Sequence, residues 1–186
     1  MFTTERLILR PYKQSDVDEL LTDLVSYQTQ LWTNPLFITP KSPKWREDWQ
    51  KALEAFLFHA VLVLKNEPDK IVGLLVIGMS PRETKNRNGE LGIALLPEYR
   101  NQRFGPEVVN FAVDYGFRGL GFHRMSLTAF GGNERALKVY ERVGFVKEAT
   151  LRKANWVEGE WQDIIQMGIL EDEWRDKKKG SESISV

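Results

Sequence analysis

Two hydrophobic patterns alternate along the chain. Compact apolar runs bounded by turn residues are typical of strands, and they occur at residues 7–10, 58–64, 71–79, 90–96, 123–130, 145–154 and 162–170. Apolar residues spaced three and four apart are typical of helices with one buried face, and they occur at residues 15–25, 45–56, 105–117 and 133–143. This order of elements predicts a single α+β, or mixed α/β, domain whose strands pair as hairpins near both ends.

Polar and turn-forming residues set the limits of these elements. Ser15 and Asn133 are suited to cap the helices that follow them, and Gly144 is suited to end the helix that precedes it. Prolines interrupt residues 26–45, so this segment is predicted to be irregular. The charged segment "RDKKKGSESISV" has little to bury, and we expect a domain of residues 1–174 followed by a flexible tail of residues 175–186.

Composition narrows the class of protein. The 26 Lys and Arg residues equal the 26 Asp and Glu residues, so no net charge favours nucleic acid or an anionic membrane as a partner. The absence of cysteine excludes disulfides, and the two histidines lie far apart in sequence, which argues against a metal site. No apolar run approaches the roughly 20 residues of a membrane span, and charges interrupt the N-terminal apolar run, so we expect a soluble cytoplasmic protein.

The stretch "LLPEYRNQRFGPEVVNFAVDYGF", residues 95–117, carries the clearest chemical signal. If a helix begins near Gly105, the backbone N–H groups of residues 102–105 can converge on one point, where the helix dipole favours negative charge. Arg100 and Arg103 flank that point, so a phosphate or pyrophosphate is the expected ligand. A plain strand-to-helix turn with solvated arginines explains the same residues equally well.

Four segments carry a family resemblance that spans residues 3–174 in order. They read "TTERLILRPYKQSDVDEL", "GELGIALLPEYRNQRFGPEVVNFAVDYGF", "LGFHRMSLTAFGGNERALKVYERVGFVKEATLR" and "WQDIIQMGILEDEW". Together they resemble the GCN5-related N-acetyltransferase superfamily, and most of all its branch of bacterial enzymes that acetylate the N-terminal alanine or serine of ribosomal proteins. The resemblance implies a mixed, largely antiparallel sheet of about six to seven strands with about four helices, splayed between its fourth and fifth strands.

The same resemblance implies a reaction and its substrates. It implies that acetyl-CoA, as cosubstrate, donates an acetyl group to a primary amine by direct attack in a ternary complex. The amine is a protein N-terminus or a small amine, and the expected assembly is a monomer or a homodimer. A catalytically weak or inactive protein of the same fold, acting as a CoA-binding or protein-interaction module, is the alternative.

A pyrophosphate loop is the best-matched motif of that superfamily. Its pattern is Gln or Arg, two residues, Gly, one residue, then Gly or Ala; Arg100 fills the first place, Gly105 the last, and Arg103 the place of the inner glycine. A side chain at that place is unfavourable if φ is positive, whereas with negative φ the guanidinium of Arg103 could itself bind a phosphate. The implied cofactor-binding residues are Leu95, Leu96, Arg100, Asn101, Gln102, Arg103, Phe104, Gly105, Pro106, Asn133 and Ala136.

Tyr140 and Glu90 are the candidate catalytic residues. Tyr140 matches the tyrosine that serves as the acid for the leaving thiolate in similar enzymes, and a phenol is protonated at neutral pH; a core tyrosine is the alternative. Glu90 would share a strand face with Gly92 and Ala94, beside room for a substrate, and could act as the base. A solvated carboxylate at the end of the strand is the alternative for Glu90. The attack could also proceed through a water chain or with an amine that is already neutral, and would then need no dedicated base.

The acceptor is expected opposite the cofactor, beside a concentration of tryptophans. These residues either wall the acceptor site or simply pack, and they are Trp32, Trp45, Trp49, Trp156 and Trp161.

Overall fold

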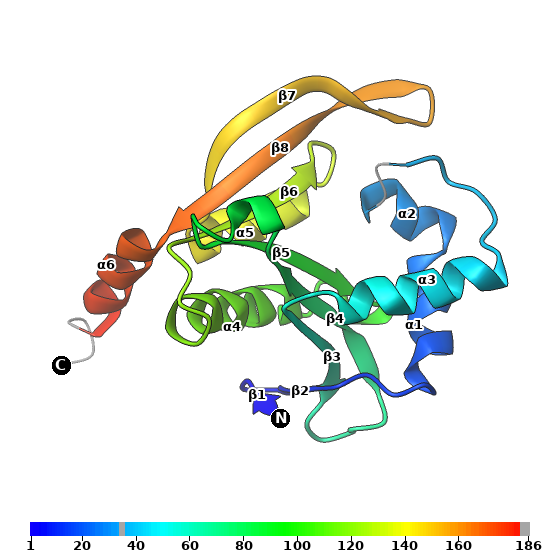
Figure 1. The fold of residues 1–186 in the computed structure, drawn as a ribbon, viewed down its shortest axis with the longest axis horizontal. Coiled ribbons are helices and arrows are strands. Elements are labelled where there is room, and N and C mark those ends of the chain that lie inside the picture. Colours follow the sequence, from blue (N-terminus) through cyan, green and yellow to red (C-terminus); the bar gives the residue numbers. More distant parts are fainter. Residues whose placement is uncertain (34–35, 183–186) are drawn as a thin grey trace.

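The computed structural model describes residues 1–33 and 36–182, which form one open sheet with helices on both faces (Figure 1). The sheet has eight strands in the order β1-β2-β3-β4-β5-β6-β8-β7, and every neighbouring pair is antiparallel except β5 and β6. The strands are β1 (Phe2–Thr3), β2 (Leu7–Arg10), β3 (Phe58–Leu64), β4 (Ile71–Gly78), β5 (Asn88–Leu95), β6 (Arg124–Phe130), β7 (Val146–Val157) and β8 (Glu160–Leu170).

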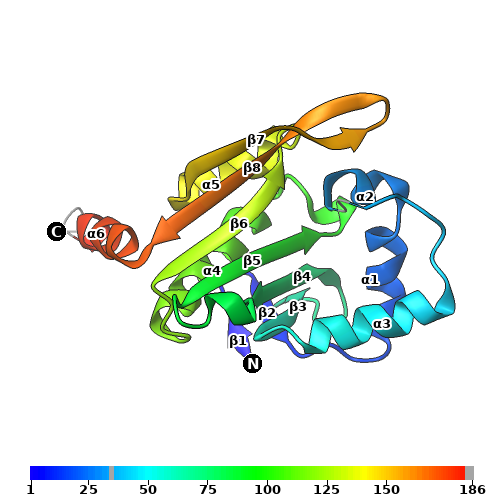
Figure 2. The same cartoon turned by 45° about the horizontal axis from the view of Figure 1, so that its top comes forward.

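Helices cover the two faces unequally (Figure 2). Their bounds are α1 (Asp16–Leu24), α2 (Tyr27–Thr33), α3 (Pro43–Glu54), α4 (Phe104–Arg118), α5 (Glu134–Val143) and α6 (Glu171–Glu182). The larger core lies between α4 and the sheet, where Val108 of α4 packs in one cluster with Leu62 and Leu75. On the opposite face, Leu20 of α1 and Leu53 of α3 form a second cluster with residues of β3 and β4. This division follows from strand alternation, because successive residues point to opposite faces.

The parallel pair β5 and β6 diverges along its length. Their pairing covers only Asn88–Glu90 and Arg124–Ser126. Beyond Ser126, β6 continues to pair with β8 alone, while β5 continues to pair with β4 alone. The splay predicted between the fourth and fifth strands, counted from residues 7–10, is therefore confirmed. One edge of β5 beyond Glu90 faces this opening.

The predicted fold class is confirmed, but the numbers of elements differ. The described residues contain one further strand, β1, and two further helices, α2 and α6. Helix α2 lies in the segment predicted to be irregular; it ends at Thr33, before Asn34 and Pro35, which lie outside the described residues. Its burial explains its formation, since Thr29, Gln30 and Leu31 are buried. Tertiary packing thus stabilises a short helix that periodicity alone did not indicate.

The cap predictions have mixed outcomes. Asn133 caps α5 as predicted, because its side-chain oxygen accepts a hydrogen bond from the backbone N–H of Ala136 at 3.2 Å. Gly144 ends that helix with φ of 124°. Ser15 makes no side-chain cap, because its own backbone is already right-handed helical.

Residues 175–182, predicted to belong to a flexible tail, are the last eight of the 12 residues of α6. Two contacts with Asp114 hold this helix against α4: the indole N–H of Trp174 donates to it at 2.7 Å, and the ammonium of Lys178 pairs with it at 2.8 Å. The ammonium of Lys177 also donates to the carbonyl of Val143 at 2.7 Å. Sequence composition did not reveal these partners. The remaining tail, residues 183–186, lies outside the described residues, and the domain boundary at residue 174 stays a prediction.

Candidate functional site

The loop between β5 and α4 forms a concave backbone surface. Asn101 and Arg103 are left-handed, with φ of 68° and 64°, and Gln102 between them has a negative φ. Helix α4 begins at Phe104, and the backbone N–H groups of residues 102–105 form no hydrogen bond with any described residue. Alternating backbone handedness makes successive N–H groups converge, which is the geometry of an anion-binding nest. The helix dipole adds favourable potential at the same point.

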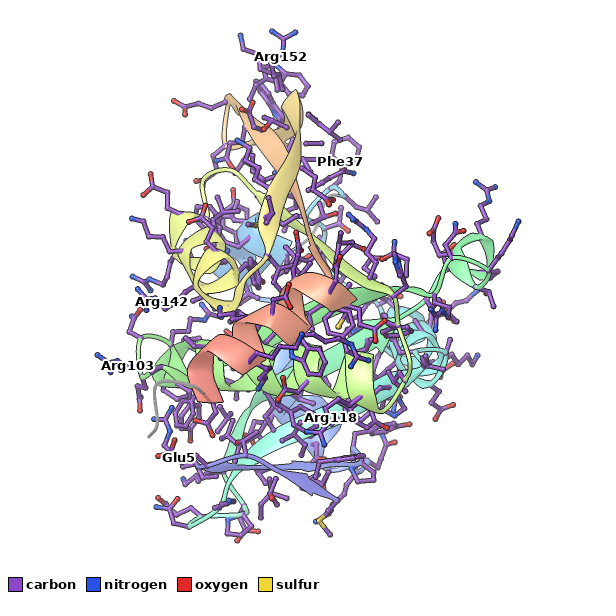
Figure 3. All side chains as sticks on the ribbon, turned by 90° about the vertical axis from the view of Figure 1, so that its left-hand side faces the viewer. Glu5, Phe37, Arg103, Arg118, Arg142 and Arg152 are labelled. Atoms are coloured by element: carbon purple, nitrogen blue, oxygen red, sulfur yellow. The ribbon has the colours of Figure 1, made fainter. Side chains whose placement is uncertain are left out.

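Arg103 has the positive φ that glycine adopts without strain. A left-handed conformation costs a residue with a side chain roughly 1–2 kcal/mol, so the arginine strains this loop. Its side chain is exposed and projects away from the ribbon at the start of α4 (Figure 3). Only the backbone of Arg103 therefore contributes to the concave surface, and the alternative of a negative φ at this position is excluded.

Arg6, which the sequence did not single out, holds the loop from outside. Its guanidinium donates to the carbonyl of Gln102 at 2.9 Å, lies 4.1 Å from the centre of the Phe104 ring, and pairs with Glu107 at 2.8 Å. Burial acts to raise the pKa of Glu107, but hydrogen bonds from Thr4 and Arg6 outweigh it and lower that pKa. These contacts fix the first turn of α4. No local sequence signal reveals them, because the partners are about a hundred residues apart.

Arg100 differs from its predicted placement. Its Nε donates to the carbonyl of Leu95 at 2.9 Å, and its Nη2 donates to Asp23 at 3.0 Å and to the hydroxyl of Thr29 at 3.1 Å. Its backbone N–H donates to the carbonyl of Pro97 at 3.2 Å. The guanidinium is therefore committed to α1, α2 and the end of β5, and does not flank the loop as expected.

The open edge of β5 offers unpaired backbone groups. The N–H of Leu96 donates to the carbonyl of Val72 at 2.9 Å, so Leu96 and Ala94 direct their backbone groups toward β4. By alternation, the groups of Ile93 and Leu95 point into the splay. The contact between Arg100 and the Leu95 carbonyl agrees with this orientation. A ligand that paired with this strand would therefore meet Ile93 and the N–H of Leu95, and the predicted cofactor contacts of Leu95 and Leu96 stay predictions.

Tyr140 lies on α5, which approaches the start of α4. A β-carbon built on Gly105 would lie 3.9 Å from the side chain of Val139, the neighbour of Tyr140. The ring of Tyr140 packs edge-on against Phe145, with the ring centres 6.0 Å apart, and its hydroxyl has no hydrogen-bond partner among the described residues. Burial raises the pKa of Tyr140 to about 12. The phenol is thus a protonated donor without a protein acceptor.

Glu90 lies at the inner end of the splay. The register between β4 and β5 is unbroken from Gly78 with Glu90 to Gly73 with Leu95, so the predicted alternation holds and Glu90 shares a face with Gly92 and Ala94. That face is opposite α4, because Leu91 belongs to the α4 cluster. Tyr140 packs against this same α4 cluster. The two predicted catalytic side chains therefore belong to opposite faces of the sheet.

Aromatic side chains surround the outer end of the splay. Trp156 and Trp161 pack edge-on, 5.0 Å apart, beside the turn of the β7–β8 hairpin, and both are more than half exposed. The hydroxyl of Tyr27 on α2 donates to Glu158 in that turn at 3.1 Å. Trp32, also on α2, contacts the turn that follows β6. Trp49 packs in the smaller core instead. An amine with an apolar part would find both rings and carboxylates here.

Two structural features are absent among the described residues. Within residues 1–33 and 36–182, no three His, Asp or Glu side chains are arranged to hold a metal ion. Across the same residues, no helix has the length and apolar character required to cross a bilayer.

Comparisons with known proteins agree with this geometry. The sequence profile of the acetyltransferase (GNAT) domain matches residues 6–146. The spermidine N(1)-acetyltransferase of Vibrio cholerae is 31% identical over 94 residues, which cover 50% of this chain and 54% of that enzyme. The putative ribosomal N-acetyltransferase YdaF of Bacillus subtilis is 24% identical over 193 residues, which cover 96% of this chain and 100% of that protein.

Solved structures show the same fold. The spermidine N-acetyltransferase of Vibrio cholerae in complex with CoA and spermine superposes with a TM-score of 0.79 at 23% identity, covering 91% of this chain and 98% of that one. At this identity the likeness concerns the fold alone. The profile match spans most of the chain, and the mixed, largely antiparallel sheet with its splay is the one that the resemblance implied. The chain therefore belongs to the acetyltransferase (GNAT) domain family.

Proposed function

We propose that this protein transfers the acetyl group of acetyl-CoA to a primary amine within a ternary complex. The observation that carries the proposal is the concave run of four unpaired N–H groups, residues 102–105, at the end of a splayed strand. A pyrophosphate matches the charge and the number of donors. The open edge at Ile93 and at the N–H of Leu95 can pair with an amide-containing arm, as an added strand would; the Leu95 carbonyl is already bonded to Arg100.

The residues of the chain divide the chemistry between the two faces of the sheet. Acetyl-CoA supplies a reactive thioester. The amine nitrogen attacks the thioester carbon, a C–N bond forms, and the C–S bond breaks. Glu90, on the acceptor face, accepts the proton of the amine directly or through water. Tyr140, on the cofactor face, donates its proton to the departing sulfur. The raised pKa of Tyr140 keeps that proton available across the physiological range.

A small amine is the favoured acceptor. The spermidine N(1)-acetyltransferase of Vibrio cholerae is 31% identical to this chain over 94 residues, a higher identity than that of YdaF. The carboxylate of Glu158 beside the Trp156 and Trp161 rings offers a cation a partly apolar surface. A peptide N-terminus, the acceptor suggested by the ribosomal branch, would contact the same surface.

Product analysis separates these acceptors. The purified chain is incubated with acetyl-CoA and either spermidine or peptides that begin with alanine or serine, and the products are identified by mass spectrometry. We expect acetylated spermidine, with loss of transfer in Tyr140→Phe. Acetylated peptide with unmodified spermidine would replace the small amine by a protein N-terminus. Saturable binding of acetyl-CoA without transfer to any amine would favour the alternative of a CoA-binding module and refute the proposed activity.

A further inference from the structure

Arg100 is the centre of a partly buried polar network between three elements, and its own side chain is 33% exposed. Its guanidinium donates to Asp23 at the end of α1, to Thr29 in α2 and to the carbonyl of Leu95 at the end of β5. The hydroxyl of Thr29 donates in turn to Asp23 at 3.1 Å. Thr29 is only 3% exposed, and the Asp23 side chain is 13% exposed. Charged partners that are shielded from water interact more strongly than surface pairs.

The far end of α2 contacts the other splayed strand. A β-carbon built on Gly132, in the turn after β6, would lie 3.0 Å from ring atom Cζ3 of Trp32. At its beginning, α2 contacts the β7–β8 hairpin through the hydrogen bond from Tyr27 to Glu158. Helix α2 therefore bridges the open end of the splay, tied to β5 through Arg100 and to β6 through Trp32. Figure 2 shows α2 beside the ends of both strands.

We propose that Arg100 is a positioning residue for the amine acceptor, because it holds α2 across the open end of the splay. This inference rests on the proposed acetyl transfer. The loop that carries Arg100 continues directly into the concave backbone of residues 102–105. Its side chain, however, points to the acceptor side, so the same short segment shapes one binding site with its backbone and the other with its guanidinium. Loss of the network frees α2 without removing any N–H group from the concave loop.

Thr29 provides the sharpest perturbation because valine has nearly the same shape as threonine. In Thr29→Val, Arg100 and Asp23 each lose a hydrogen-bond partner, whereas Thr29→Ser keeps the hydroxyl. Removing a hydrogen bond to a charged group corresponds to roughly a tenfold change in equilibrium. We expect the acceptor KM for spermidine, the probe amine, to rise about tenfold in Thr29→Val and in Arg100→Lys. The dissociation constant of acetyl-CoA, measured by calorimetry, is expected to stay unchanged. Thr29→Ser is expected to restore the acceptor KM.

A surface ion pair between α3 and α1 provides the matched control. Arg46 pairs with the exposed Asp18 of α1, so Arg46→Lys makes the same chemical change without touching the network. We expect no effect of this variant on either substrate. A raised acetyl-CoA dissociation constant with unchanged acceptor KM in Arg100→Lys would make Arg100 a cofactor contact and overturn the proposal.

Hydrogen exchange tests the network independently of turnover. In the proposal, the amides of residues 30–33 exchange about tenfold faster in Thr29→Val than in the parent or in Thr29→Ser. If spermidine is not acetylated but this acceleration is observed, the proposed acceptor fails while the restraint of α2 stands. Unchanged exchange of these amides in Thr29→Val would refute the positioning role even in an active enzyme.

Discussion

Replacing Arg103 by glycine and by alanine measures the strain in the concave loop. Arg103 has φ of 64° and its side chain is exposed. Glycine removes a left-handed cost of roughly 1–2 kcal/mol, and the greater freedom of the unfolded chain takes back about 0.4–1 kcal/mol. Arg103→Gly is therefore expected to raise the free energy of unfolding by about 0.5–1 kcal/mol. Alanine keeps the left-handed cost, so Arg103→Ala is expected to gain nothing.

Thermal and chemical unfolding of the three proteins provide the assay. For a chain of this size, about 1 kcal/mol corresponds to a Tm difference of roughly 2–4 °C. We expect the glycine variant to have a higher Tm than the parent. The Tm of the alanine variant is expected to equal that of the parent within the scatter of surface substitutions. Equal Tm values for glycine and alanine would show that residue 103 is not strained. Both variants are expected to keep the acetyl-CoA affinity of the parent; a tenfold loss in both, about 1.4 kcal/mol, would show that the guanidinium binds a phosphate.

Three further predictions concern individual side chains. Tyr140→Phe is expected to lower kcat by about a hundredfold or more. Because the folded-state pKa of about 12 lies above the ordinary value of 10.0, the parent is expected to lose stability as pH rises from 10 to 12. Unfolding curves at alkaline pH are expected to show a smaller loss for Tyr140→Phe. Glu90→Gln is expected to lower kcat/KM for the amine at neutral pH while leaving Tm unchanged, and an unaltered pH profile would exclude Glu90 as the base. Asp16→Asn is expected to cost about 3–5 kcal/mol in denaturant titrations, because Asp16 is 5% exposed and pairs with Arg10 at 2.7 Å.

The pH dependence of Asp16 has a definite sign. Burial acts to raise its pKa, but the hydrogen bonds from Arg10 and from the N–H of Lys13 outweigh burial and lower the pKa below 3.8. A lowered pKa in the folded state gives stability that is present above the unfolded value and is lost as pH falls. Parent and Asp16→Asn are therefore expected to converge in stability below about pH 4. A constant difference between them down to pH 2 would contradict this pairing.

Local signals in the sequence were sufficient for most of the sheet and for the position of the concave loop. Residues such as Val108 and Val109 repeat at helical spacing, and Asn133 is a cap residue by type, so α4 and α5 could be predicted from near neighbours. The splay followed from family resemblance alone, since no local pattern shows where two strands separate.

Long-range contacts account for what could not be predicted. Helix α2 forms because Thr29 and Leu31 are buried against other elements, and α6 extends past residue 174 because Asp114 binds it. The direction of the Arg100 side chain depends on Asp23, which is 77 residues away in sequence. The sign of φ at Arg103 decided between two predicted roles for that residue, and side-chain identity alone does not specify it.

A titration followed by amide resonances tests the central claim most directly. The purified chain, labelled with ¹⁵N, is titrated with acetyl-CoA while the backbone N–H signals of residues 102–105 are recorded. The account predicts saturable binding in which the observable amide proton resonances of residues 102–105 shift downfield together. Such a shift is expected when each N–H donates a hydrogen bond to a phosphate oxygen. Saturable binding that leaves these amides unmoved, or the absence of any binding, would contradict the assignment of the loop between β5 and α4 as the pyrophosphate site.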